Sequence, residues 1–447
     1  MGAWLLAIPV QLSDSFTEFT AVHGRSLGQV IAAEFYNGTY FRPFRRALIK
    51  LVFDASAGHY YLAFRGFQVL QLVVLLLLVA RMLRVRSAPG LVSLPLALAV
   101  LIGIHTFAGA VREGLPINHF LTILICCAAA VNVAQATRTL TTDVAAIVLL
   151  IVAALTIESG LLVWVIFVVC YAVGYRGVSR RALIAATACV GLYFVVRFVV
   201  IGGAAPGLNE RSAGFGFSVL DPDELVRRFG SNPLPFYAYN VLCAISTVLF
   251  AEPRGGVWVF VRELIGGRPE PWQVVNVLTS AATSVLLARF ALSRVRDWRS
   301  GDIGEADRFL ILFLAILPVN ALFAGGYEKD VIMSPAGLFY AAAAYFVFRE
   351  LLAGTQIPVA PVLVLMVAIG WSVRFVGIHD SLRARALSVR DEWAYYDDWA
   401  RQQPNDIQLN AEEQAIRQHL YDDAVLRAPR VPQLSLGGVD RFFDFTQ

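Results

Sequence analysis

The chain contains 447 residues, of which 57% are hydrophobic and 16% are charged, and its mean hydropathy is +0.63. Soluble proteins carry charges on about a quarter of their residues, so this composition excludes an ordinary soluble protein and predicts an all-α, polytopic transmembrane protein. The formal net charge of +4 says little by itself, and no nucleic-acid partner is expected.

The predicted elements begin with a short apolar run at 2–12, a polar loop at 13–59 and a long apolar run at 60–83. Runs of about 18 apolar residues are long enough to cross the hydrocarbon core of a membrane. Further membrane helices are predicted at 91–111, 118–136, 143–157, 160–175, 182–201, 272–292, 309–324, 335–353 and 357–377. Residues 236–250 are apolar but short, and we interpret them as a re-entrant or interfacial helix. The sequence therefore predicts about 11–12 membrane helices.

After residue 378 the chain becomes polar and charged. We therefore divide it into a transmembrane domain at 1–378 and a small helical extramembrane tail at 379–447. Within the first domain, residues 13–59 form a long first outer loop with interfacial helices. The five cysteines lie in apolar runs without C-x-x-C spacing, so we expect neither disulfides nor zinc ligands.

Arginines in short loops set the predicted orientation, because cytoplasmic loops carry an excess of positive charge. Three clusters are assigned to the cytoplasm: Arg81, Arg84 and Arg86; Arg176, Arg180 and Arg181; and Arg294, Arg296, Arg299 and Arg308. The outer face then receives the loops at 13–59, 112–118, 158–160, 202–235 and 325–335, together with the tail. The predicted location is a bacterial inner (plasma) membrane, with multiple passes and the C-terminal tail outside.

The first outer loop contains the candidate catalytic residues. Asp14 and Glu18 are four residues apart, so both carboxylates are expected on one face of a helix. A carboxylate in a partly dry pocket can act as the general base for a hydroxyl acceptor. The alternative interpretation is structural, because Ser15-x-x-Glu18 matches a helix capping box.

Candidate phosphate ligands are arginines in this loop and in the membrane helices. Arg42 lies in the run Tyr40–Arg46, which sets arginines among aromatic residues. Such a run fits bidentate phosphate binding, and it equally fits plain anchoring at the membrane interface. Arg65 and Arg197 lie within predicted helices, where a charge usually marks a functional site. The alternative for both is that the side chain reaches the membrane surface.

Further charges stand at the outer ends of helices. Glu158 lies between two short helices, cannot reach as far as an arginine, and is expected to pair with Arg65 or Arg197. Lys329 follows Glu328 in a short outer loop and is one of only two lysines in the chain. Ordinary solvation of a loop is the alternative explanation for these adjoining charges.

Several motifs are absent from the sequence. There is no H-x-x-x-H or H-E-x-x-H pairing, so no dedicated metal site is predicted. Neither G-x-x-x-x-G-K-[ST] nor G-x-G-x-x-G occurs, which argues against a nucleotide as direct donor. No cofactor is expected, and participation of a divalent cation is left open.

A series of short motifs resembles the GT-C superfamily of membrane glycosyltransferases, and most closely its protein O-mannosyltransferase-like branch. An acid in the first outer loop (Asp14) precedes an Arg-Pro dipeptide (Arg42-Pro43) and a helix leading into the second membrane helix. Four later segments match the family in order: TIESG at 156–160, LYFVVR at 192–197, GYEKDVIMSPAGLFY at 326–340 and RDEWAYYDDWARQQPND at 390–406. The chain departs from the family in its short first apolar run and in the serines that flank Asp14.

The resemblance implies an inverting transfer of a sugar from a polyprenyl-phosphate-linked donor to a glycan, lipid or protein acceptor on the outer face. It implies catalytic roles for Asp14, as general base, and for the neighbouring Glu18. It implies that the donor phosphate meets Arg42, Arg65, Arg197 and Lys329, and that Glu158, Tyr193 and Glu328 shape the cavity. If so, residues from Asp14 to Lys329 should converge in space.

Two other functions remain open at this point. A secondary transporter would fit the many helices and the charges within them, although no repeat relates the two halves of the chain. A non-catalytic membrane scaffold whose tail binds a partner is the third interpretation. A cavity that opens sideways to lipid near Asp14 would favour the transferase, and a central pathway open to both sides would favour the transporter.

Overall fold

The computed structural model describes residues 2–36, 40–112, 119–203, 212–214, 217–250, 257–327, 329–353, 359–402 and 409–427. Two predicted site residues fall outside this description: Glu328 entirely, and Asp14 in its side chain. The described residues are almost entirely helical, which confirms the predicted all-α class. The exception is a small antiparallel hairpin of β1 (Ser212–Gly214) and β2 (Phe217–Leu220).

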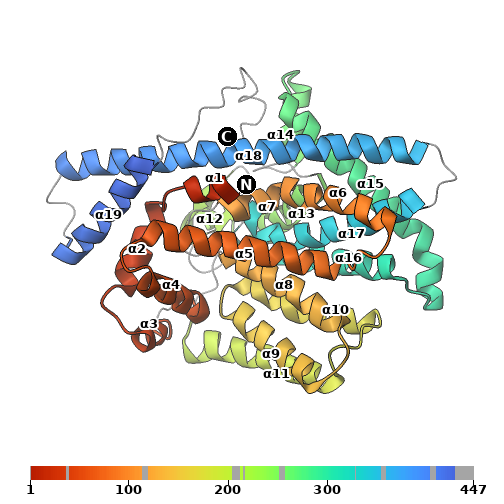
Figure 1. Ribbon diagram of the computed structural model, residues 1–447, viewed down its shortest axis with the longest axis horizontal. Coiled ribbons are helices and arrows are strands. Elements are labelled where there is room, and N and C mark those ends of the chain that lie inside the picture. The colour runs from red at the N-terminus through yellow and green to blue at the C-terminus, as the bar shows by residue number, and fades with distance from the viewer. Residues whose placement is uncertain are drawn as a thin grey trace.

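Four short helices form the amino-terminal region, at the lower left of the bundle except for α1 (Figure 1): α1 (Gly2–Ala7), α2 (Ser13–Val22), α3 (Leu27–Ala33) and α4 (Pro43–Ala55). Proline at the first position starts α4, where its missing N–H costs nothing. Ser26 and Gln29 form the capping box that starts α3. The predicted outer loop is therefore a folded set of helices that packs against the next helix, α5.

The following helices are α5 (Tyr60–Met82), α6 (Ala88–Gly103), α7 (His105–Arg112) and α8 (His119–Gln135). Next come α9 (Leu140–Ala154), the 3-10 turn η1 (Glu158–Leu161), α10 (Leu162–Ala172), α11 (Arg180–Phe194) and the π-helical turn η2 (Val195–Val200). The predicted helix at 91–111 is bent by 62° where α6 gives way to α7. The extended Ile104 ends α6 and separates the two helices.

After the hairpin come α12 (Pro222–Phe229), α13 (Leu234–Phe250), α14 (Val257–Ile265), α15 (Pro271–Ser300) and α16 (Glu305–Ala324). The chain continues through the 3-10 turn η3 (Asp330–Met333), α17 (Ser334–Ala353), α18 (Val359–Gln402) and α19 (Ala411–Arg427). The segment that we interpret as re-entrant is α13, which meets α12 at 98°. It packs against α15 and α16.

Five helical segments are long and apolar enough to cross a membrane: Tyr60–Met82, Arg180–Val200, Pro271–Ser300, Glu305–Ala324 and Asp330–Ala353. The number becomes seven if each of the two bent pairs is one span, and four shorter apolar helices accompany them among the described residues. Large apolar side chains on these helices, such as Leu77, Leu192 and Val285, are more than half exposed. Exposed apolar surface on this scale is expected where helices face lipid.

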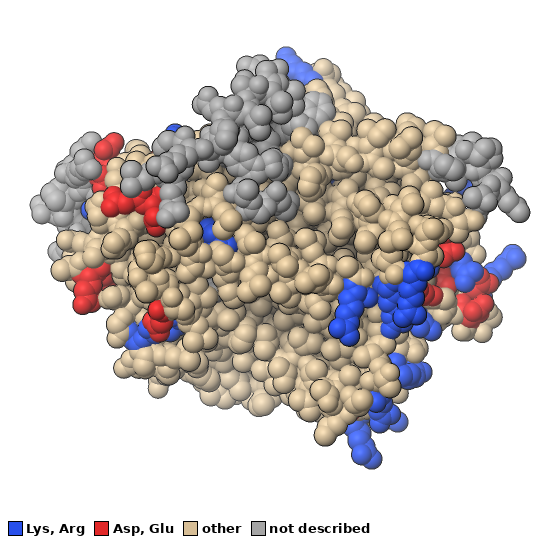
Figure 2. Space-filling model, in the orientation of Figure 1, with Lys and Arg blue, Asp and Glu red and all other residues tan. Residues whose placement is uncertain are grey.

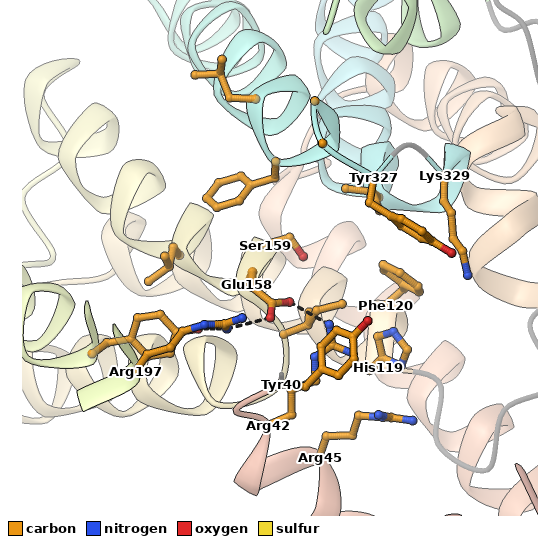
Figure 3. Close-up of a pocket in the computed structure, with 18 of the residues that line it drawn as sticks. Tyr40, Arg42, Arg45, His119, Phe120, Glu158, Ser159, Arg197, Tyr327 and Lys329 are labelled. Carbon is orange, nitrogen blue, oxygen red and sulfur yellow. Dashed lines mark hydrogen bonds and ion pairs between the residues drawn. The ribbon is translucent and has the colours of Figure 1, made fainter. Parts of the chain in front are cut away.

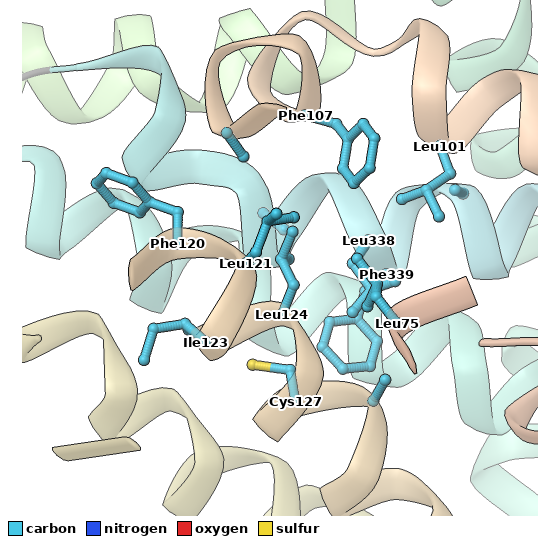
Figure 4. Packing of buried hydrophobic residues seen from close by; sticks show 14 of the residues in the cluster. Leu75, Leu101, Phe107, Phe120, Leu121, Ile123, Leu124, Cys127, Leu338 and Phe339 are labelled. Atoms are coloured by element: carbon cyan, nitrogen blue, oxygen red, sulfur yellow. The ribbon is translucent and has the colours of Figure 1, made fainter. Parts of the chain in front are cut away.

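Helix α17 lies at the centre of the fold. Every residue from Ser334 to Phe348 is buried, and α17 packs against α6, α8, α16 and α18. Figure 4 shows Leu338 and Phe339 of α17 close to side chains from α5, α6, α7 and α8. The four alanines at 341–344 allow neighbouring helices to approach closely.

Helix α18 continues without a break past residue 378, where the sequence predicts that the membrane domain ends. Its later turns bury Leu382, Ala386, Val389 and Trp393. The Trp393 indole N–H donates a hydrogen bond to the carbonyl of Val10 at 2.8 Å. The first part of the predicted tail is therefore joined to the helix before it and packed onto the amino-terminal helices (Figure 1).

Many basic residues gather on the right of Figure 2, with some acidic residues among them, and a broad, largely uncharged surface separates this group from several acidic residues on the left. Arg84 and Arg86 after α5 line the same hollow as Arg308 of α16 and Tyr175, the neighbour of Arg176. Members of two of the predicted cytoplasmic clusters thus come together, and the third cluster adjoins them. This grouping is what a common membrane face requires.

Candidate functional site

A cavity of about 690 Å³ lies between the first-loop helices, the turns η1 and η2, α13 and the connection from α16 to α17. Figure 3 shows its charged side chains pointing inward from these separate elements. Its cations are Arg42, Arg45, Arg46, Arg197 and Lys329, and its carboxylates are Glu18, Glu34 and Glu158. Its apolar wall includes Phe120, Ile157, Leu161, Phe194, Phe198, Val241, Leu322, Phe323 and Ile332.

Glu158 lies at the junction of the charged groups. Its Oε2 accepts a hydrogen bond from Arg42 Nη2 at 2.9 Å, and its Oε1 accepts one from Arg197 Nη1 at 2.7 Å. One carboxylate therefore joins the first loop to the turn η2, as the dashed lines in Figure 3 mark. Of the two partners expected for Glu158, Arg65 and Arg197, the structure shows Arg197, and Arg42 is a second partner.

Gly160 explains why the chain turns so tightly beside Glu158. A Cβ atom at this position would lie 2.0 Å from the carbonyl oxygen of Ala153 at the end of α9. Only glycine permits this approach of the two backbones. The first loop is joined to the same hairpin, because the N–H of Phe44 donates to the carbonyl of Leu155 at 3.1 Å.

Arg197 is positioned by a local change in helix geometry. Residues Val195–Val200 form a π-helical turn at the end of α11, and such turns occur frequently at functional sites. Arg197 is almost completely buried, and its Nη1 also donates to the hydroxyl of Tyr193, one helical turn earlier, at 2.8 Å. Tyr193 therefore lines the cavity and orients the arginine, as the sequence predicts.

The remaining charges of the first loop form a continuous network. Glu18 of α2 accepts hydrogen bonds from Arg45, at 2.9 Å, and from Arg46. Arg46 also donates from Nε to Glu34 at 3.0 Å, and Glu34 accepts the backbone N–H of Arg42 at 2.9 Å. Burial lowers the pKa of Arg46 below its usual range. This network holds α4 against α2 and directs Arg42 toward Glu158.

These contacts correct two interpretations of α2. Glu18 is held by two guanidinium groups and anchors α4, so its predicted catalytic role is not supported by its surroundings. The alternative interpretation, a capping box at Ser15-x-x-Glu18, is wrong. The helix already begins at Ser13, its cap residue is Leu12, and Glu18 faces the arginines.

Asp14 lies on α2, one helical turn before Glu18. Thr17 and Glu18 of the same helix line the cavity. Residues four apart lie on the same face of a helix. The backbone thus places position 14 beside the cavity-lining turn, while its side chain lies outside the description.

Lys329 reaches the cavity from the opposite wall (Figure 3). Its ammonium group lies 5.7 Å from the centre of the Tyr327 ring, and no described carboxylate forms an ion pair with it. The Asn320 side chain fixes this connection, because it donates to the carbonyl of Ile332 at 2.8 Å and accepts from the N–H of Ala336 at 3.0 Å. His105 of α7 binds the neighbouring Asp330 at 2.6 Å.

Arg65 does not line the cavity, which corrects its predicted role as a phosphate ligand. Its guanidinium is buried beneath the amino-terminal segment and donates to the carbonyls of Ile8 and Pro9 at 2.7 and 2.6 Å. A third hydrogen bond reaches the side chain of Gln68 at 2.7 Å. Arg65 therefore fixes the turn after α1 and does not reach the surface.

The charge balance of the cavity favours an anion. Five cations against three carboxylates leave two positive charges in excess among the described lining residues. Each of these carboxylates is already held by arginine, whereas Lys329 has no such partner in this part of the chain. Beside an apolar wall, such an arrangement can bind a phosphate whose substituent is apolar. No group of histidine, cysteine and acidic side chains suited to a metal ion occurs within the described ranges.

Several lining residues were not predicted as site residues: Glu34, Tyr40, Arg45, Arg46, His119 and Tyr327. The centre of the Tyr40 ring lies 4.4 Å from the guanidinium carbon of Arg42. Its place in the Tyr40–Arg46 run was the available signal. Tyr327 lies in the GYEKDVIMSPAGLFY motif beside Lys329, which was its signal. His119 carries no such signal, since only the fold brings it to the cavity.

Comparisons with known proteins found no family model, no curated protein and no solved structure that matches this chain.

Proposed function

We propose that this protein is a membrane glycosyltransferase of GT-C type that transfers a sugar from a polyprenyl-phosphate donor to an acceptor at the outer membrane face. One observation carries the proposal: Arg42, Glu158, Arg197 and Lys329, which are spread over almost 300 positions, meet in one cavity. The short-motif resemblance predicts this convergence, and hydropathy alone does not require it.

The chemistry of the cavity suits an amphiphilic donor. Arg197 and Lys329 stand on opposite walls, so a phosphate between them would meet positive charge from both sides. The apolar wall that includes Phe194, Phe198 and Leu322 would lie along the first isoprene units. An isolated phosphate would not need this wall, and a neutral lipid would not need the cations.

The proposed reaction is a single displacement with inversion. The acceptor hydroxyl oxygen forms a bond to the anomeric carbon while the bond from that carbon to the donor phosphate oxygen breaks. The electron pair leaves with the polyprenyl phosphate, whose developing charge is stabilised by Arg197 and Lys329. The acceptor proton passes to Asp14, and general base catalysis of this kind contributes about 10²–10⁴-fold to the rate.

The topology belongs to the same proposal. It comprises about 11–12 membrane helices, with the first loop and the tail on the outer face of a bacterial inner membrane. The arginine clusters around the hollow that is lined by Arg84, Arg86 and Arg308, at the other end of α17, support this orientation. The acceptor is a glycan, lipid or protein that approaches from that outer face.

The transporter is supported less well than the transferase. Ile332, just before α17, lines the outer cavity, and Arg349 near its end lines the hollow among the arginine clusters. Between them, α17 is buried continuously from Ser334 to Phe348, and the two cavities share no described lining residue. Among the described residues, no cavity therefore runs along α17 from one end to the other, and the central pathway that would favour a transporter is not seen there.

Transfer by the purified protein in liposomes tests the proposal, with polyprenyl-phosphate mannose as donor and release of polyprenyl phosphate as the readout. We expect turnover by the native chain and a loss of at least 100-fold in Asp14→Asn. Asp54→Asn is the matched control, because Asp54 lies on α4 of the same loop, is exposed and contacts Lys50. Full activity of Asp14→Asn would remove the assigned base, and inactivity of the native chain with several polyprenyl-phosphate sugars would overturn the function.

A further inference from the structure

A second cavity, of about 390 Å³, lies among the arginine clusters that we assign to the cytoplasmic face. It is lined by Arg84, Arg86, Ser87, Tyr175, Glu305, Arg308 and Arg349. These residues come from the segments after α5 and α10, from the starts of α6 and α16 and from near the end of α17. Helix α17 has 20 residues, so its length separates this cavity from the outer one by about 30 Å.

The cavity contains four guanidinium groups and one carboxylate, an excess of three positive charges. Only Arg349 is paired with carboxylates, at 3.5 Å from Glu305 and 3.2 Å from Glu350 outside the cavity, so Arg84, Arg86 and Arg308 keep their charge without an ion pair among the described residues. Arg308 lies over the ring of Tyr175 at 4.9 Å, and its Nε is buried without a hydrogen-bond partner in the described chain. Buried donors are normally paired, so this N–H indicates a missing acceptor.

Arg84 provides an independent indication. Its φ angle is +44°, a left-handed conformation that favours glycine after a helix end. The conformation turns the chain so that Arg84 Nη2 donates to the carbonyl of Gln135 at 2.7 Å. Arg84 therefore adopts a backbone conformation that glycine would adopt with less strain. Its side chain lines the cavity. Such backbone strain often accompanies ligand sites.

The lining differs from that of the outer cavity in one decisive respect. Among the described residues, no aliphatic side chain lines it, and Tyr175 contributes its single aromatic ring. An apolar chain would gain nothing inside such a cavity, whereas a doubly or singly charged oxyanion would meet several N–H donors. The cavity therefore suits the polar part of a ligand alone.

We infer that the second cavity binds a phosphate group at the cytoplasmic face, carried by an anionic lipid headgroup or by a small soluble phosphate ester. The lipid would leave its acyl chains outside, along the neighbouring helices, as basic pockets between membrane helices allow. The soluble ester would enter from the aqueous side. The inference does not depend on the proposed transferase activity.

Binding by the full-length protein in phosphatidylcholine nanodiscs tests this inference with two probes. Glycerol phosphate is titrated calorimetrically as the soluble ester, and phosphatidylglycerol is added to the nanodisc and its retention is measured by native mass spectrometry. We expect one probe to bind saturably with one site per chain. Arg308→Gln should weaken that binding at least tenfold, and Arg86→Gln at least threefold.

Arg299→Gln is the matched control, because Arg299 is exposed, belongs to the same arginine-rich face and does not line the cavity. It should bind the probe as the native chain does. Arg86 is also exposed, so its variant tests the inference even if Arg308→Gln fails to fold. Saturable binding of neither probe would overturn the inference, and so would an equal loss in Arg299→Gln and Arg86→Gln, which would indicate diffuse surface charge.

Discussion

This protein buries arginines in two kinds of setting, one beside a cavity and one within the packed interior. At the outer cavity, Arg197 and Arg42 share the carboxylate of Glu158, and the cavity carries excess positive charge. Beneath the amino-terminal helices and inside α18, Arg65 and Arg374 donate to backbone carbonyls and uncharged side chains. Arg374 also lies 4.0 Å from the Trp371 ring centre.

The difference shows that a charge within an apolar helix does not by itself mark a site. Arg65 and Arg374 satisfy carbonyls and hydroxyls that would otherwise be unpaired, so their charge contributes to the fold. Arg197 ends at a cavity, where part of its guanidinium faces a space large enough for a ligand. Burying a charge is costly in either setting. Only Arg197, beside the cavity, can offer its charge to an incoming anion.

The largest loss of stability is expected from substitution of Gly160, because the tight turn that positions Glu158 would be disrupted. Gly160→Ala places a methyl group 2.0 Å from a backbone oxygen, and we expect a loss of about 3 kcal/mol in stability because backbone must move. Gly191→Ala in α11 has open space around its Cβ and should be neutral. Thermal unfolding in detergent measures both, and equal melting temperatures would contradict the close packing.

The next largest loss of stability is expected when the carboxylate that Arg42 and Arg197 share is removed. Glu158→Gln leaves Arg42 and Arg197 without their common anion, and loss of one partner from a buried pair costs on the order of 3 kcal/mol. Because Glu158 keeps some exposure, we expect a somewhat smaller loss, together with loosening of the first loop. Hydrogen exchange of the amides in α4 should rise. Unchanged exchange there would show that the first loop does not depend on Glu158.

The variants Arg65→Gln and Arg197→Gln directly compare an arginine that contributes to the fold with one that lies beside the cavity. Arg65→Gln leaves the carbonyls of Ile8 and Pro9 unpaired, so stability should fall by about 2 kcal/mol while affinity for polyprenyl phosphate stays unchanged. Arg197→Gln should weaken that affinity at least tenfold. Competition with a labelled lipid phosphate provides the measurement. An affinity loss in Arg65→Gln equal to that in Arg197→Gln would erase the distinction between the two settings.

The smallest effect on stability is expected at Lys329, which is exposed and contacts the ring of Tyr327. Lys329→Gln should leave the melting temperature unchanged and weaken lipid-phosphate binding about threefold to tenfold, as expected for one hydrogen bond at an exposed position. Arg262→Gln is the control, since its side chain is 74% exposed and lies outside both cavities. Equal affinities of Lys329→Gln and the native chain would exclude Lys329 from the phosphate site.

Much of the fold follows from hydropathy. The segments at 60–83, 182–201 and 309–324 are apolar over the length of a membrane span, and helices occupy each of them. The extent of α18 could not be predicted. Its later turns are held by a contact of Trp393 with Val10 near the amino terminus, and that contact joins residues almost 400 positions apart.

The site could be predicted only where one residue was unusual in its surroundings. Glu158 and Arg197 stand out because charge is costly among apolar residues, and the two do pair. The same rule selected Arg65, because a sequence shows the cost of burial and not the partner that offsets it. Arg46 ends the Tyr40–Arg46 run, but nothing in the sequence identified Glu34 or Glu18 as its partners, so their network could not be predicted.

The central claim is that the outer cavity holds a lipid phosphate, and photo-crosslinking tests it most directly. A polyprenyl phosphate with a photoactivatable group next to the phosphate would be irradiated with the native protein in membranes, and the labelled peptides would be mapped. The account predicts labels in Tyr193–Val200 and in the connection around Lys329 that Arg197→Gln and excess unlabelled lipid phosphate both reduce. Labels confined to the lipid-facing surfaces of α5 or α15, unaffected by Arg197→Gln, would contradict it.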